Sequence, residues 1–106
     1  MKVNFFIGYD PKEDIAYRVC KYSLLKRSSN NVNVMSLKLD ELVAKKLYTR
    51  PIDPLASTQF TYTRFLVPLL NNYEGWAVFC DCDFIFLNDV SNLFSNLDSS
   101  KAIYCV

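Results

Sequence analysis

The first third of the chain carries three successive patterns that restrict the fold more than any other part. The run VNFFIGY at residues 3–9 is short and apolar, which predicts a strand buried on both faces. Asp10 then matches a helix N-cap, and apolar residues recur at helical spacing over residues 11–27, with Glu13 placed to close a capping box. Residues 32–37 alternate like a second strand. This order forms a right-handed crossover, so the sequence predicts an α/β fold with a mostly parallel open sheet and flanking helices.

The remaining pattern extends this sheet within a single domain of 106 residues. A second central strand is expected at residues 76–80, continuing through 84–87, because apolar residues flank a polar interruption on both sides. The other expected elements are a turn at residues 28–31, a short helix at 40–48, a proline-bearing loop at 49–54, a buried helix at 57–70 bent by Pro68, a helical turn near 90–94, and an apolar edge strand at 102–106.

Charge and hydropathy exclude several classes of protein. Twelve Lys and Arg residues against eleven Asp and Glu residues give a net charge of +1, which removes the attraction on which nucleic-acid binding depends. No apolar stretch approaches the roughly 18 to 20 residues of a membrane span, and the N-terminus has no signal cleavage site. We therefore expect a soluble protein with no nucleic-acid partner and no membrane span.

The cysteine and histidine content restricts both the compartment and the chemistry. The four cysteines lack metal-site or redox spacing and lie in apolar patterns, which is typical of reduced core thiols in a cytoplasmic protein. They are Cys20, Cys80, Cys82 and Cys105. Histidine is absent, so an acid, base or metal ligand from this chain must be a carboxylate, a thiol or a hydroxyl.

Two aspartates follow the second central strand. Side chains alternate along a strand, so Asp81 and Asp83 are expected on one side and Cys82 on the other. With Cα atoms about 6.5 to 7 Å apart, the two carboxylates can converge on one divalent cation, and hard oxygen ligands favour Mg²⁺ or Mn²⁺. The alternative is that both carboxylates mark a strand end that reaches solvent.

The ends of the two central strands are expected to border one crevice, because open parallel sheets bind ligands at their carboxyl edge. There Tyr9 can stack on a base, and Asp10 can accept a hydrogen bond from a base or ribose or serve as a plain N-cap. Arg64 is the one charge on the predicted buried helix. Its guanidinium suits the Asp81 and Asp83 carboxylates, a phosphate, or a structural salt bridge.

The chain contains three sequence blocks in succession, FFIGYDPKEDIAYRVCKYSL, RPIDPLASTQFTYTRFLVPLL and GWAVFCDCDFIFLNDVSNLF. Together, in this order, they resemble the N-terminal half of a GT-A-fold glycosyltransferase, nearest to family eight. The resemblance implies a Rossmann-like donor domain in which the strand end at Gly8, Tyr9 and Asp10 holds the nucleoside. It also implies that Arg64 lies beside the donor sugar and phosphates. The segment Asp81, Cys82 and Asp83 would line the donor site, with the two aspartates ligating a divalent metal, usually manganese.

The function implied by the resemblance is metal-dependent transfer of a sugar, with retention, from a nucleotide donor such as a UDP-sugar to an unidentified acceptor. No catalytic residue is assigned. In family eight a further metal ligand, often His, and the acceptor surface come from the C-terminal half, so residues 1–106 are expected to be the donor half alone, truncated at the C-terminus.

Two alternatives to the transferase remain open. The first is a catalytically incomplete GT-A module that binds nucleotide or forms homo-oligomers through the edge strand at residues 102–106. The second is a haloacid-dehalogenase-like phosphatase, in which Asp81 would be the nucleophile and Asp83 the general acid. Phe84 and Ile85 depart from the motif of that class.

Overall fold

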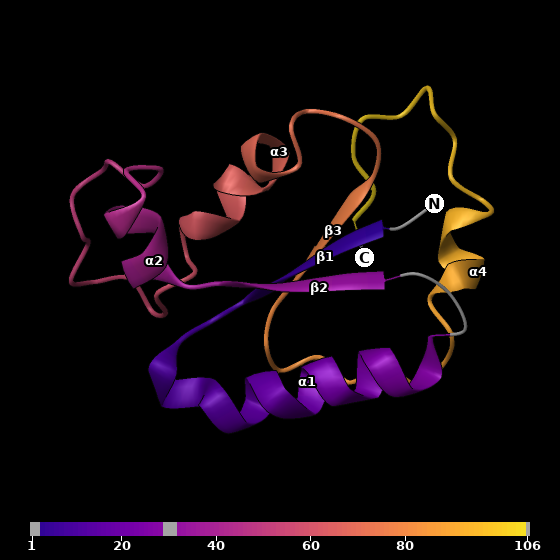
Figure 1. Cartoon of the computed structure of the whole chain (residues 1–106), viewed down its shortest axis with the longest axis horizontal. Helices are drawn as coiled ribbons and strands as arrows, with labels where there is room; N and C mark the ends of the chain where they lie inside the picture. The colour runs from indigo at the N-terminus through magenta and orange to yellow at the C-terminus, as the bar shows by residue number, and fades with distance from the viewer. Residues whose placement is uncertain (1–2, 29–31, 106) are drawn as a thin grey trace.

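The computed structural model describes residues 3–28 and 32–105, and it has the expected α/β architecture. Three parallel strands form a sheet in the order β2-β1-β3, with helices on both faces (Figure 1). The strands are β1 (Val3–Gly8), β2 (Val32–Leu37) and β3 (Ala77–Cys80). The prediction that the first strand is central is confirmed, whereas the prediction that the second strand, at residues 76–80, is central is wrong, because β3 has only β1 beside it in the described sheet. The turn predicted at residues 28–31 lies mostly outside the described residues.

The crossover between β1 and β2 begins with the predicted N-cap. The Asp10 carboxylate accepts a hydrogen bond from the Lys12 amide at 3.0 Å, and Pro11 opens a 3₁₀ turn, η1 (Pro11–Glu13), that leads into α1 (Asp14–Arg27). The capping box is not closed as predicted, since the Glu13 carboxylate instead accepts a contact from the Cys82 thiol at 3.7 Å. Helix α1 lies along one face of the sheet (Figure 1), where Phe86 and Phe94 from the chain after β3 also pack against Phe5.

The opposite face is covered by short helical segments. They are α2 (Leu39–Ala44), η2 (Thr63–Leu66) and α3 (Val67–Leu70). The prediction of one buried helix over residues 57–70 is wrong, because residues 57–62 form turns and Phe65 is 74% exposed. The Thr58 amide donates to the Thr61 hydroxyl, which itself donates to the Thr58 carbonyl, and these bonds favour a turn there. Pro68 is tolerated because it stands in the first turn of α3.

Strand β1 organises the core on both faces of the sheet. Phe5, Phe6 and Ile7 are all at most 1% exposed. Phe6 packs with Leu37, Leu42, Tyr48 and Val67 on the side of α2 and α3. Phe5 and Ile7 pack on the side of α1, where their partners include Leu24, Cys20, Phe60, Cys80 and Cys82. The run of adjacent apolar residues is therefore explained by a strand that is covered on both faces.

The chain after β3 departs most from the expected pattern. Residues 81–87 do not continue the strand; they cross α1, where the Phe86 amide donates to the Ser23 hydroxyl at 2.9 Å. A helical turn, α4 (Ser91–Phe94), follows as predicted. The prediction of an edge strand at residues 102–106 is wrong for residues 102–105, which are exposed and do not pair with a strand. Residue 106 lies outside the described part of the chain. An apolar run forms no ladder unless another strand lies beside it.

The four cysteines differ in burial in the same way as the segments that carry them. Cys20, Cys80 and Cys82 are free and buried, as expected for core thiols, whereas Cys105 is free and exposed. No helix within residues 3–28 or 32–105 has both the length and the apolar character needed to cross a membrane.

Candidate functional site

Parallel pairing places the ends of β1 and β3 side by side. Ile7 pairs with Cys80, so the chain leaves both strands at the same edge of the sheet, as Gly8 to Asp10 on one side and as Asp81 to Asp83 on the other. We call these residues, together with Arg64, the carboxyl-edge site. This is the edge at which open parallel sheets bind ligands.

Asp10 is the most buried polar residue of this site. It is 6% exposed, and its carboxylate accepts hydrogen bonds from the backbone amides of Lys12 at 3.0 Å and Gln59 at 3.1 Å. The N-cap interpretation is therefore confirmed, and the second bond ties the end of β1 to a distant part of the chain. Each oxygen keeps a lone pair that a ligand can use.

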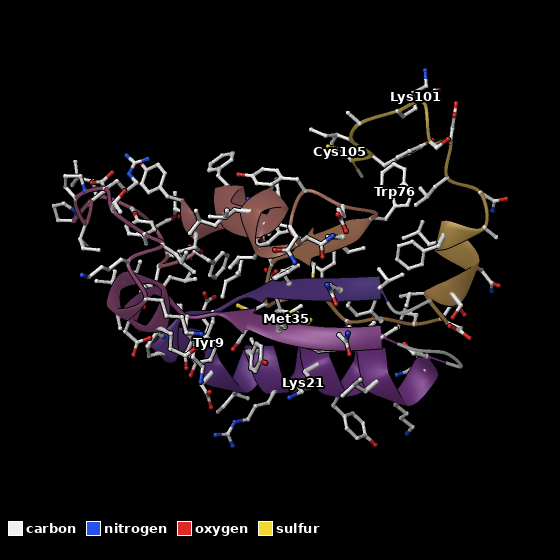
Figure 2. All side chains as sticks on the ribbon, turned by 45° about the horizontal axis from the view of Figure 1, so that its top comes forward. Tyr9, Lys21, Met35, Trp76, Lys101 and Cys105 are labelled. Atoms are coloured by element: carbon white, nitrogen blue, oxygen red, sulfur yellow. The ribbon has the colours of Figure 1, made fainter. Side chains whose placement is uncertain are left out.

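Tyr9 is held in place by its neighbours at the start of α1 and after β2. Its hydroxyl donates to the Asp14 carboxylate at 2.7 Å, its ring meets Tyr17 edge to face, and the Lys38 ammonium lies 5.1 Å from its centroid. The hydrogen bond to Asp14 raises the pKa of the Tyr9 hydroxyl. Figure 2 shows Tyr9 at the end of the sheet where the strands lead into the helices.

Gly8 has a packing role. A Cβ at this position would lie 2.5 Å from the Phe60 ring, closer than real Cβ contacts come. Glycine is therefore needed so that Phe60, which is 4% exposed, can lie against the end of β1. The Gly8 backbone can still border a ligand, but its side facing Phe60 is closed.

Asp81, Cys82 and Asp83 lie in a turn, in which the Phe84 amide bonds to the Asp81 carbonyl at 3.4 Å. The predicted alternation along a strand therefore does not apply here. The side chains nevertheless differ in exposure as they would on a strand: Cys82 is 1% exposed, whereas both aspartates are accessible. Burial, followed by the charge of Glu13, raises the pKa of the Cys82 thiol to about 11, so it packs as a neutral thiol.

Arg64 reaches this turn from η2. Its Nη2 lies 3.4 Å from Oδ1 of Asp81, and its Nε donates to the Phe60 carbonyl at 3.4 Å. The guanidinium also lies over the Phe79 ring, 4.9 Å from the centroid. The pair is partly exposed, at 37% for the arginine and 43% for the aspartate, so it is weak and open to exchange with a ligand.

The described residues contain no group of three or more Asp, Glu, Cys or His placed to hold a metal ion. Asp81 and Asp83 can supply two carboxylate ligands of the hard oxygen type that Mg²⁺ and Mn²⁺ prefer. Such a pair fits a metal whose other ligands are water and the oxygens of a bound phosphate, as is common for these ions.

A pocket of about 160 Å³ opens beside Asp10, and the sequence patterns did not point to it. Its polar lining comes mainly from the segment after the proline-bearing loop. The lining includes Lys12, Asp53, Ser57, Thr58, Gln59 and Tyr62. Tyr62 is fixed by a 3.0 Å hydrogen bond to Asp53 and by the Arg50 guanidinium, 3.7 Å from its ring centroid. The sequence signal for this pocket is the density of polar residues at the start of the predicted helix.

Comparison with curated proteins finds a similar chain in a plant. The chain is 48% identical over 103 residues to a plant protein from Arabidopsis thaliana, Protein CDI. The match covers 97% of this chain and 40% of the relative, so the chain spans less than half of the protein it resembles. No protein-family profile matches the chain, and no solved structure matches it.

Proposed function

We propose that this chain is the donor-binding half of a GT-A-type glycosyltransferase that binds a nucleotide-diphosphate sugar, with UDP-sugars as the first candidates. The observation that carries the proposal is the parallel register of β1 and β3, by which the segments that carry Asp10 and Asp81 leave the sheet at the same edge, where Arg64 is ion-paired to Asp81. An aromatic ring, buried and accessible carboxylates, and a cation stand at one sheet edge, which suits a ligand made of a base, a ribose and two phosphates.

The chain's own residues have distinct parts in this proposal. Tyr9, oriented by its hydrogen bond to Asp14, offers a ring face to the base, and Asp10 offers an acceptor to the base or ribose. Asp81 and Asp83 would hold the divalent cation, Mn²⁺ or Mg²⁺. When bound, the cation neutralises the charge that builds on the diphosphate as the glycosidic bond breaks. The proposal also includes transfer of the sugar with retention to an unidentified acceptor, which the family resemblance implies.

Arg64 is expected to exchange partners when the donor binds. Its Nη2 lies 3.4 Å from Oδ1 of Asp81, and a diphosphate offers the same guanidinium more oxygens at higher charge. Release of Asp81 then frees a carboxylate for the metal. Metal and diphosphate should therefore bind more tightly together than either binds alone.

The first test is titration calorimetry with uridine diphosphate, with and without Mn²⁺. We expect manganese-dependent binding with a Kd between about 1 μM and 1 mM. The double variant Asp81→Asn with Asp83→Asn should remove the manganese dependence. The matched control, Asp40→Asn with Asp98→Asn, removes two exposed carboxylates elsewhere and should bind like the wild type. Binding that is indifferent to manganese in the wild type would contradict the metal site.

Arg64→Ala separates phosphate binding from nucleoside binding. It should weaken uridine diphosphate about tenfold or more, as expected for a lost charge-assisted bond, and leave uridine nearly unchanged. Equal weakening of both ligands would show that Arg64 acts only through the fold.

The incomplete-module alternative predicts a different outcome. In that case the chain binds nucleotide but neither transfers nor hydrolyses the sugar. Slow release of sugar from a UDP-sugar to water, measured by chromatography, would favour the transferase over the module. Sedimentation velocity across a wide concentration range tests the proposed homo-oligomer, and trapping of an aspartyl-phosphate on Asp81 would favour the phosphatase.

A further inference from the structure

The outer face of α1 is more apolar than its packing explains. Cys20, Ser23 and Leu24 are the buried residues of this helix, and they face the sheet. Ile15, Val19 and Tyr22 follow at spacings of four and three residues, so they form one stripe on the other side. Ile15 is 79% exposed and Tyr22 is 64% exposed. We call these three residues the α1 stripe.

Positive charge is concentrated around the α1 stripe. Helix α1 contains four cations and one anion, whereas the rest of the chain contains eight cations and ten anions. Asp14 is neutralised by Arg18 at 2.8 Å. Lys21, Lys26 and Arg27 are exposed, and the Lys26 ammonium lies 5.5 Å from the centroid of the Tyr22 ring. The molecule is therefore electrically polarised, with α1 as its positive side.

We propose that α1 docks on the surface of a membrane that contains anionic lipids. A helix of 14 residues is about 21 Å long and can lie in the plane of the interface, with the α1 stripe entering the acyl boundary. Lys21 and Lys26 would keep their ammonium groups among the lipid phosphates while their stems lie along apolar surface. A tyrosine ring suits this boundary because one end is apolar and the other is polar.

Two other occupants fit the α1 stripe less well. A second copy of the chain would bring the same positive helix against its partner, and like charges at close range repel. A protein groove that receives a helix encloses much of its circumference, but one side of α1 is already packed on the sheet (Figure 1). A flat anionic surface matches the exposed half alone.

Vesicle co-sedimentation of the full chain tests the proposal. Vesicles of phosphatidylcholine with one quarter phosphatidylserine are compared with pure phosphatidylcholine at moderate salt. We expect at least tenfold tighter binding to the anionic vesicles. Lys21→Glu with Lys26→Glu should lower this binding about tenfold or more, and Ile15→Ser with Tyr22→Ser should lower it to a similar extent.

The matched control has the same change in net charge at another place. Lys45→Glu with Lys101→Glu alters two exposed lysines outside α1, and Figure 2 shows Lys101 on the opposite side of the molecule from Lys21. This variant should bind within about twofold of the wild type if α1 is the docking surface. All substituted side chains are exposed, so folding should be retained, and far-ultraviolet circular dichroism checks this.

The remaining outcomes overturn the proposal. Equal losses in the control and in the α1 lysine variant would show attraction by net charge alone. An unchanged Ile15→Ser with Tyr22→Ser variant would exclude insertion, as would a Tyr22→Trp variant whose added emission does not shift to the blue on anionic vesicles. Absence of binding to both vesicles would leave an acidic protein as the occupant of the α1 stripe.

Discussion

The described residues from 3 to 44 form two six-residue strands, the short 3₁₀ turn η1 and two α-helices, whereas the described residues from 45 to 105 hold one four-residue strand and three helical segments of four residues each. The first part is stabilised locally, by a capped helix and a crossover between paired strands. The second part gains its order by lying against β1 and α1. Short elements of this kind are stable only through tertiary contacts.

The largest difference between the two parts should appear when one phenylalanine of each is removed. Phe5→Ala takes away a ring with no exposed surface and should lower the free energy of unfolding by about 3 to 5 kcal/mol. Phe65→Ala removes a ring that is 74% exposed and should change it by about 0.5 kcal/mol or less. Urea denaturation measures both, and similar losses would contradict the view that β1 organises the core.

These two residues also show what sequence patterns can and cannot predict. The strand at Phe5 was predictable because a short, fully apolar run fits a strand that is covered on both faces. Residues 63–70 around Phe65 are helical, but the helix predicted from residue 57 starts too early, because the Thr58–Thr61 turn precedes it, and apolar composition does not by itself imply burial. Periodicity reports local preference, whereas exposure depends on which neighbours are present.

The candidate site also has features that the sequence could predict and features that it could not. The edge shared by Asp10 and Asp81 followed from the order of the strands, and the N-cap role of Asp10 followed from its place before Pro11. The Asp10 to Gln59 bond and the pocket beside it could not be predicted, because they join segments that are 49 residues apart through a loop of irregular geometry.

A smaller effect is expected where the two parts of the chain meet at Gly8 and Phe60. Gly8→Ala sets a methyl group 2.5 Å from the Phe60 ring and should cost about 1 to 3 kcal/mol. In a Phe60→Ala background the same change should cost less than half as much, because the clash is gone. Thermal or urea unfolding of the four proteins in this cycle gives the coupling energy. Equal costs in both backgrounds would show that the strain lies in the backbone and not against Phe60.

The smallest effect concerns pH and the contact between Cys82 and Glu13. Burial and the nearby carboxylate raise the Cys82 pKa from 9.0 to about 11, so the unfolded chain releases this proton first. The thiol's contribution is complete below pH 9 and is lost as the pH rises to about 11, which amounts to up to about 2 kcal/mol.

Urea denaturation at several pH values between 8 and 11 measures this effect. Cys82→Ala should make the decline in stability shallower, and Cys105→Ala, which removes an exposed thiol, should keep the wild-type slope. A slope unchanged in Cys82→Ala would mean that other groups account for the whole decline.

The strand order has a consequence for the sequence of folding events. Phe5 pairs with Val34 in β2 and with Val78 in β3, so the second pairing closes a much longer loop of chain. Long loops are entropically costlier to close and contacts of this kind form slowly. We expect β1, α1 and β2 to assemble first and β3 to dock afterwards. The carboxyl-edge site needs the ends of both β1 and β3, so it is completed in the last step and is the first part to be lost when the molecule opens.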